Sequence, residues 1–327
     1  MNGDETECGT MARMTPSVNG LHHITAIAGA PQENLDFYAG VLGMRLVKKS
    51  VNQDEPGTYH LFFADAEGHP GTDLTFFPWS QHAPGRLGHG LAVEVTLEVP
   101  PGSLEFWAER ATRYGAHGAA IEQRFGARAL PLTDPHGMHL ALVEGAAQPT
   151  RAFTPWDESP VEANKQIRGL EGSRLWERDP GGTASFLTAV MGFRQAGSED
   201  GWTRYIVEQG GAGQHLDLRA APDAPRGTWG VGTIHHLAWR VPDDAAQLAL
   251  RGAVEDAGRR PTEVIDRFWF RSVYFLEPGG VLFELATDGP GFTADEDLAT
   301  LGEHLVLPPW LEPMRGEIEA ALPKLDY

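Results

Sequence analysis

The sequence predicts an α+β fold made of four βαβββ modules. One order of elements recurs four times along the 327 residues: an apolar strand, an amphipathic helix, then several strands ending in a hairpin. Two of these hairpins close on Asp134-Pro-His-Gly and Glu277-Pro-Gly-Gly, which join strand to strand without a helix. A doubly wound parallel sheet would place a helix at such connections, and no glycine-rich phosphate loop opens any expected helix.

The first module illustrates the pattern. Its helix begins near Pro31, which suits a first helical turn, and ends before Gly43. Between them, Leu35, Tyr38 and Leu42 recur at helical spacing. The expected strands of this module are residues 21–28, 45–50, 58–64 and 72–77.

The other three modules follow the same order. Their first strands begin at Leu91, Gly169 and Ile234. Their expected helices are residues 103–114, 183–191 and 243–257. Their last strands are expected at residues 138–143, 214–218 and 281–286, the last one preceded by a strand at 271–275.

The repetition divides the chain into two paired domains and a tail. Residues 20–145 form an N-terminal domain of two modules, and residues 167–288 form a C-terminal domain of two modules. The segment between them is rich in Ala, Pro, Thr and Glu and is expected to be a linker. Residues 289–327 lack the pattern, so we expect them to pack on the surface as a helix and loop.

Composition limits the classes of partner. Forty-five acidic and 26 basic residues give a formal charge of −19, which argues against nucleic acid and membrane surfaces as partners. The single cysteine, Cys8, excludes an intramolecular disulfide framework and fits a reducing compartment. Neither an apolar run of membrane-spanning length nor an apolar signal core is found in the sequence. We therefore expect a cytoplasmic protein.

Two matched histidine pairs suggest a metal site. His22-His23 and His235-His236 open the first strands of the first and fourth modules, and the second pair follows the first at an interval of 213 residues. Because side chains alternate along a strand, only one histidine of each pair can enter the same cavity directly. The residues alone leave open which one it is.

A carboxylate accompanies the histidines. Glu284 lies between Phe283 and Leu285, which should be buried, and a buried carboxylate needs a partner. If the preceding turn is centred near Gly279, Tyr274 lies opposite Glu284 and faces the same cavity. Two imidazoles and one carboxylate leave up to three adjacent positions of an octahedral ion open, as in non-haem Fe(II) enzymes, although Mn²⁺, Zn²⁺ and Ni²⁺ suit the same donors.

The other modules are expected to lack a metal site. Alignment of the turn glycines puts Phe76 and Ala141 in the position of Glu284 in the first two modules. The third module has Asp217 there, but Glu171 replaces the histidine that a site would need. We also expect Lys48 and Lys49 to mark a solvated strand edge, and His60 to be structural or exposed.

With these residues, the chain resembles the vicinal oxygen chelate superfamily, which includes glyoxalase I, extradiol ring-cleaving dioxygenases and fosfomycin-resistance proteins. The resemblance covers about residues 20–305 and implies the glyoxalase/bleomycin resistance/dihydroxybiphenyl dioxygenase fold. Within the superfamily, Leu21-His-His-Ile-Thr, Leu42-Gly-Met-Arg-Leu-Val-Lys-Lys and Ile234-His-His are similar to the hydroquinone-type ring-cleaving dioxygenases.

The resemblance implies a set of site residues. It implies a mononuclear Fe(II), with Mn(II) as the other candidate, bound by His23, His236 and Glu284. It also implies roles beside the metal or the substrate for a second group: His22, Thr25, His235, Arg267 and Tyr274.

The implied activity is a ring-cleaving dioxygenase that inserts O₂ into a hydroquinone-type or catechol-type aromatic diol. The implied partners are the diol, O₂ and further copies of the chain in a homo-oligomer. Two alternatives stay open: a glyoxalase-like isomerase or thiol transferase, and a protein that binds small aromatics, for example for resistance. Glyoxalase I chemistry commonly uses a second carboxylate in the hairpin position that Phe76 is expected to occupy, which disfavours the first alternative.

Overall fold

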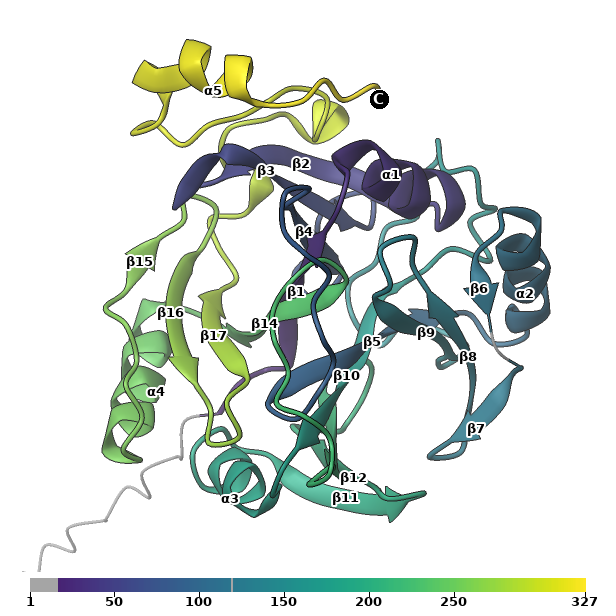
Figure 1. Cartoon of the computed structure of the whole chain (residues 1–327), viewed down its shortest axis with the longest axis vertical. Coiled ribbons are helices and arrows are strands. Elements are labelled where there is room, and N and C mark those ends of the chain that lie inside the picture. The colour runs from purple at the N-terminus through teal and green to yellow at the C-terminus, as the bar shows by residue number, and fades with distance from the viewer. Residues whose placement is uncertain (1–16, 119) are drawn as a thin grey trace, which may run out of the picture.

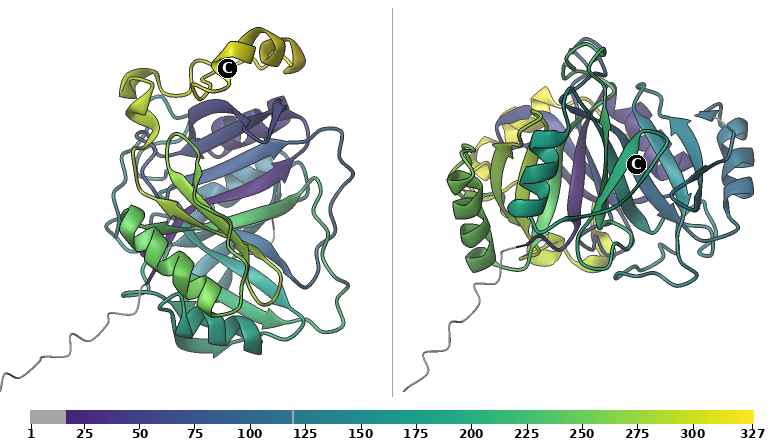
Figure 2. Two further views of the ribbon diagram at one scale, coloured as in Figure 1. Left: turned by 90° about the vertical axis from the view of Figure 1, so that its left-hand side faces the viewer. Right: turned by 90° about the horizontal axis from the view of Figure 1, so that it is seen from below.

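The computed structural model describes residues 17–118 and 120–327, and Cys8 lies outside them. Two large mixed sheets, of eight and nine strands, form the body of the molecule, with helices on their outer sides (Figures 1 and 2). The predicted α+β class and the repeated strand–helix–strand order are confirmed.

The eight-stranded sheet combines the first module with the fourth. Its strands run in the order β15-β16-β17-β14-β1-β4-β3-β2. The first module supplies β1 (Leu21–Ala28), β2 (Arg45–Asn52), β3 (Glu55–Ala64) and β4 (Asp73–Pro78). The fourth supplies β14 (Thr233–Val241), β15 (Ile265–Asp266), β16 (Arg271–Leu276) and β17 (Leu282–Thr287). The two histidine-bearing strands, β1 and β14, pair antiparallel at its centre.

The nine-stranded sheet combines the second module with the third in the same way. The second module supplies β5 (Leu91–Val99), β6 (His117–Gly118), β7 (Glu122–Arg124), β8 (Ala127–Thr133) and β9 (His139–Glu144). The third supplies β10 (Gly169–Glu177), β11 (Arg194–Glu199), β12 (Trp202–Ile206) and β13 (His215–Ala220). Here β5 and β10 pair antiparallel, so each sheet takes one module from each half of the chain.

Each module carries one helix close to its expected position. The helices are α1 (Pro31–Leu35), which continues as a π-helical segment η1 (Asp36–Val41), α2 (Leu104–Arg113), α3 (Gly181–Ala189) and α4 (Asp244–Asp256). At the start of α4, the side chain of Asp243 accepts a hydrogen bond from the backbone N–H of Ala246. This is the N-cap interaction that favours an aspartate at that position.

The tail covers the β2 side of the eight-stranded sheet (Figures 1 and 2). Its elements are η2 (Phe292–Ala294), η3 (Leu298–Thr300), η4 (Glu312–Met314) and α5 (Arg315–Ala321). The ammonium group of Lys48 lies 2.7 Å from Asp295, forms an ion pair with Glu296 and donates to the carbonyl of Phe292 at 3.1 Å. Lys48 is fully buried, so its interpretation as a solvated edge residue is wrong. The tail supplies the partners that make its burial tolerable.

The strands at the centre of the molecule are deeply buried. Every residue of β1 is buried, and one apolar cluster runs continuously through both sheets. A smaller cluster includes Phe62, Trp269 and Phe270 and borders the cavity described below. Among the described residues, no helix is both long and apolar enough to cross a membrane.

Candidate metal centre

Three strands bring two histidines and a glutamate to one point. His23 comes from β1, His236 from β14 and Glu284 from β17, which are neighbours in the sheet. Glu284 Oε2 lies 3.3 Å from His23 Nε2 and 3.0 Å from His236 Nε2. The two Nε2 atoms lie 3.2 Å apart. Within residues 17–118 and 120–327, this is the one cluster of three or more such side chains with donor atoms close enough to share an ion.

The spacing of the donor atoms fits a metal ion. Donors held about 2.1 Å from one ion in perpendicular directions lie about 3 Å from one another. Glu284 is fully buried, and its Oε2 atom has no hydrogen-bond partner among the described residues. Its other oxygen, Oε1, accepts a hydrogen bond from Ser272. A cation would compensate the buried oxygen that is otherwise left unsatisfied.

The neighbouring histidine of each pair holds the inner one in place. His22 Nδ1 lies 2.9 Å from His23 Nδ1, and His235 Nδ1 lies 2.8 Å from His236 Nδ1. These contacts occupy the Nδ1 atoms of the inner rings and leave their Nε2 atoms toward Glu284. Such outer partners fix the orientation of metal-binding imidazoles. This arrangement places His23 and His236 on the cavity side.

Electrostatics at the centre favour the forms that bind metals. Burial acts to raise the pKa of Glu284, but His23 and His236 outweigh it and hold this pKa well below its usual range. Burial lowers the pKa of His236, although Glu284 offsets part of that shift. Burial, followed by the neighbouring His236, lowers the pKa of His235 to about 3. Neutral imidazoles beside a carboxylate are the protonation states that coordinate cations.

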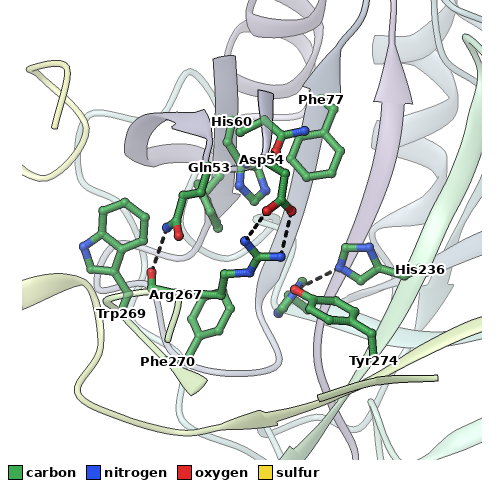
Figure 3. A pocket seen from close by; sticks show the side chains of 12 residues that line it. Gln53, Asp54, His60, Phe77, His236, Arg267, Trp269, Phe270 and Tyr274 are labelled. Atoms are coloured by element: carbon green, nitrogen blue, oxygen red, sulfur yellow. Dashed lines mark hydrogen bonds and ion pairs between the residues drawn. The ribbon is translucent and has the colours of Figure 1, made fainter. Parts of the chain in front are cut away.

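A cavity with an aromatic wall opens beside the three donors. Its apolar lining consists of Phe62, Phe77, Trp269 and Phe270. Figure 3 labels Phe77, Trp269 and Phe270. The ring centroid of Phe270 lies 5.2 Å from that of His23, so this wall reaches the candidate metal centre itself. Flat apolar walls with a few polar groups are typical of sites for small aromatic ligands.

Arg267 and Tyr274 supply polar groups on the β16 side of the cavity. The Arg267 guanidinium lies 2.9 Å from an oxygen of Asp54 and 5.4 Å from the centre of the Tyr274 ring. Burial and then the charge of Glu284 raise the pKa of Tyr274, so its phenol keeps its proton at neutral pH. Both residues therefore face the cavity in the forms that donate hydrogen bonds.

Thr25 reaches the cavity only through other residues. Its hydroxyl lies 2.7 Å from that of Thr75, and the Thr75 hydroxyl lies 3.0 Å from His60 Nε2. Thr25 itself is completely buried, whereas His60 lines the cavity.

His60 was not among the site residues expected from the sequence, although it shares a strand face with Phe62. Sequence reasoning also missed Asp54, whose position in the β2–β3 turn gave no signal.

The strand register corrects the expected counterpart of Glu284. Thr25 pairs with Thr75 across β1 and β4, and Ala238 pairs with Glu284 across β14 and β17. Thr25 and Ala238 each lie two residues after an inner histidine, so Thr75, and not Phe76, occupies the equivalent position. Alignment of the turn glycines does not identify the counterpart of Glu284, because the β3–β4 connection is longer than the β16–β17 turn. A hydroxyl replaces the carboxylate there.

The charged residues of the nine-stranded sheet pair with one another. Arg204 donates two hydrogen bonds to Asp217, at 2.8 and 3.0 Å. Glu171 accepts a hydrogen bond from Thr96 at 2.7 Å and lies 3.1 Å from His215. These carboxylates therefore already have cationic or hydroxyl partners.

Comparison with known proteins adds to this geometry. A sequence model of the Glyoxalase/Bleomycin resistance protein/Dioxygenase superfamily matches residues 20–142 and 173–285. The chain is 44% identical over 309 residues to "Putative ring-cleaving dioxygenase MhqO" of Bacillus subtilis, covering 94% of this chain and 97% of that protein. It is 34% identical over 322 residues to "Chlorohydroquinone/hydroquinone 1,2-dioxygenase" of Sphingobium indicum, covering 94% and 97%.

Solved structures share the fold. The crystal structure of a putative dioxygenase from Bacillus subtilis matches with a TM-score of 0.87 at 42% identity, covering 95% of this chain and 98% of that one. Glyoxalase I from Zea mays matches with a TM-score of 0.60 at 16% identity, covering 87% and 97%. The second likeness shows a common fold alone.

Proposed function

The chain belongs to the glyoxalase/bleomycin resistance protein/dioxygenase superfamily, and from this membership and its full-length relatives we infer that it is a ring-cleaving dioxygenase. We propose that its substrate is a hydroquinone-type aromatic diol. In the proposed reaction both atoms of O₂ enter the ring-opened product, so no further reductant is needed. The observation that carries the proposal is the convergence of His23, His236 and Glu284 beside an aromatic cavity.

We propose that these three residues hold Fe(II). Two imidazoles and one carboxylate suit non-haem iron and leave adjacent positions open, although Mn(II) binds the same donors. A redox-active metal in this place would supply the coupling between the electrons of the ring and O₂. His22 and His235 would keep the two ligand rings oriented through the contacts between Nδ1 atoms.

The cavity residues account for the binding of a diol. Phe62, Phe77, Trp269 and Phe270 would surround the ring and exclude water. The protonated Tyr274 would donate a hydrogen bond to the substrate oxygen nearest Glu284, and Arg267 would stabilise negative charge on the deprotonated diol. Thr25 would act indirectly, by fixing Thr75.

Neither alternative function has a specific observation in its favour. A glyoxalase-like isomerase would be expected to have a second carboxylate in the position of Thr75. A protein that only binds small aromatics would not need a buried glutamate whose oxygen faces two imidazole nitrogens.

Oxygen consumption tests the proposal. Protein loaded anaerobically with Fe(II) is mixed with hydroquinone, methylhydroquinone or catechol in air-saturated buffer, and O₂ uptake is followed with the absorbance of a ring-opened product. We expect uptake with wild type and none with Glu284→Ala. Mn(II)-loaded protein identifies the working metal. Wild type that carries stoichiometric iron and consumes no O₂ with any of the three diols would contradict the proposal.

A further inference from the structure

We propose that His60 is a further substrate-binding residue, whose Nδ1 atom accepts a hydrogen bond from the diol hydroxyl remote from the three metal-binding side chains. This residue would make the site selective for diols with para hydroxyl groups. The inference rests on the proposed function for its class of substrate.

His60 lies across the cavity from Tyr274, the residue that pairs with Glu284. It projects from β3, which is separated from β1 by β4 alone, and it lines the same cavity as His23 and His236. Neighbouring strands lie about 4.8 Å apart, so β3 and β1 are separated by about 10 Å along the sheet. Figure 3 shows His60 and Phe77 at one end of the pocket and Tyr274 and Phe270 at the other. A single aromatic ring between these ends would direct its second hydroxyl toward His60.

The imidazole of His60 is held rigidly. Its ring centroid lies 3.9 Å from that of Phe62 and 4.4 Å from that of Phe77. Its Nε2 atom lies 3.0 Å from the Thr75 hydroxyl, which in turn lies 2.7 Å from the Thr25 hydroxyl. If Nε2–H donates to Thr75 and Thr75 donates to Thr25, Nδ1 presents a lone pair. Among the described residues, the contact of Nε2 with Thr75 is the only hydrogen bond of the His60 side chain.

The electrostatic environment keeps this ring neutral. Burial lowers the pKa of His60 well below its usual value, and the nearby His23 and His236 lower it further. A neutral imidazole retains one nitrogen lone pair as an acceptor, and a phenolic hydroxyl is a good donor. The role that follows is binding and orientation of the hydroxyl, because so weak a base would not remove its proton.

The internal duplication relates the contact between His60 and Thr75 to a contact in the fourth module. Leu61 pairs with Phe76 across β3 and β4, so the next position places His60 opposite Phe77. In the fourth module, Ser272 pairs with Ala286, and both Phe77 and Ala286 lie two residues after the equivalent positions 75 and 284. His60 is therefore the counterpart of Ser272, and Thr75 is the counterpart of Glu284.

The two hairpins thus carry equivalent contacts with different chemistry. In the fourth module the Ser272 hydroxyl donates to Glu284, which faces the candidate metal centre. In the first module Thr75 instead anchors an imidazole that faces the cavity. The duplicated sheet therefore offers a metal-binding carboxylate on one side and a hydrogen-bond acceptor for the substrate on the other.

Anaerobic binding of two ligands tests the role of His60. Dissociation constants for hydroquinone and phenol are measured by calorimetry with the Fe(II)-loaded protein. Because the two ligands differ by one hydroxyl group, the ratio of the constants gives the contribution of that hydroxyl to binding. Wild type should prefer hydroquinone. His60→Phe keeps a flat ring but removes the acceptor, and should reduce the preference roughly five- to tenfold, the effect of one hydrogen bond. His60→Asn, whose amide oxygen can take the place of Nδ1, should restore most of it.

Controls separate this role from a structural one. His139→Phe, at an exposed position on β9 of the other sheet, should leave the ratio unchanged. 4-Methoxyphenol, whose second oxygen cannot donate, should bind wild type no more tightly than phenol, which tests the inference without any variant. An unchanged ratio in His60→Phe, an equal loss for both ligands, or His60→Asn behaving like His60→Phe would overturn the proposal.

Oxygen uptake by the same wild-type preparation separates the two proposals. If wild type consumes O₂ but His60→Phe keeps its preference for hydroquinone, only the role of His60 is wrong. If wild type binds hydroquinone through His60 but consumes no O₂, the dioxygenase proposal is wrong and the binding role stands.

Discussion

Tyr274 lies directly opposite Glu284 on the antiparallel strands β16 and β17, and its ring centroid is 5.7 Å from that of His236. This relationship places a protonated phenol beside the candidate metal ligands without making it one of them. Because burial, followed by the charge of Glu284, raises the pKa of Tyr274, the phenol is a hydrogen-bond donor across the neutral pH range. We therefore propose that Glu284 serves in metal binding and Tyr274 in substrate activation.

Tyr274→Phe should separate these two roles in solution. The substitution removes only the hydroxyl, so the variant should retain its metal while turnover falls roughly 100-fold or more, the typical contribution of a positioned proton donor. Metal content by elemental analysis and kcat by oxygen uptake check this. Tyr59→Phe is the matched control, because the Tyr59 hydroxyl donates to the carbonyl of Pro323, outside the cavity. Equal losses of turnover in the two variants would refute the assignment.

His235→Ala should weaken metal binding. His235 contacts Nδ1 of His236 at 2.8 Å, and removal of such an orienting partner typically costs roughly 10- to 100-fold in metal affinity. Competition with a chelator of known affinity measures the change. His139→Ala is the control away from the site. An affinity equal to that of wild type would show that His236 needs no orienting partner.

The buried histidines predict a pH dependence for the metal-free protein. Burial lowers the pKa of His235 from 6.5 to about 3, and His22, His60 and His236 shift in the same direction. Below pH 6.5 the unfolded chain binds protons that the folded protein does not, so stability is lost as the pH falls. Each such histidine contributes a slope of up to about 1.4 kcal/mol per pH unit. Urea unfolding at pH 7.0, 6.0 and 5.0 checks this, and a flat profile would contradict it.

Much of this site could be predicted from the sequence because its signals are local. The alternation of strand residues, the matched His-His dipeptides and the charge of Glu284 between apolar neighbours all lie within short segments. The metal-binding roles of His23, His236 and Glu284 stay a prediction, but the structure brings their donor atoms together.

The remaining features depend on distant contacts. Lys48 is buried because the tail, more than 240 residues later, brings two carboxylates to it. The position of Thr75 depends on strand register, which the unequal turns conceal. The sequence around His60 does not indicate the proposed binding role, because that role depends on β1 lying two places away from β3 in the sheet.

Lys48→Met should destabilise the protein by about 3–5 kcal/mol. The substitution leaves Asp295 and Glu296 without their buried cation, which is the costly way to break a buried ion pair. Lys49→Met is a matched control, since among the described residues Lys49 Nζ donates only to the carbonyl of Glu303, and should cost no more than about 1 kcal/mol. Equilibrium unfolding in urea compares the two. Similar effects in both variants would show that the tail is not held by Lys48.

Glu177→Gln should stabilise the protein at alkaline pH. Burial, followed by the charge of Glu277, raises the pKa of Glu177 from 4.5 to about 8. Glu277 is already satisfied by the hydroxyl of Thr183 and the backbone N–H groups of Gly279 and Val281, whereas both oxygens of Glu177 lack partners among the described residues.

Because folded Glu177 holds a proton that the unfolded chain has lost, the stability of the protein should fall as the pH rises from 4.5 toward 8. The histidines act in the opposite direction only below pH 6.5, so the range from pH 7 to 8 isolates Glu177. There the wild type should lose up to about 1.4 kcal/mol per pH unit more than Glu177→Gln, which stays neutral. Parallel profiles for the two proteins in urea unfolding would mean that Glu177 is ionised in the folded state at neutral pH.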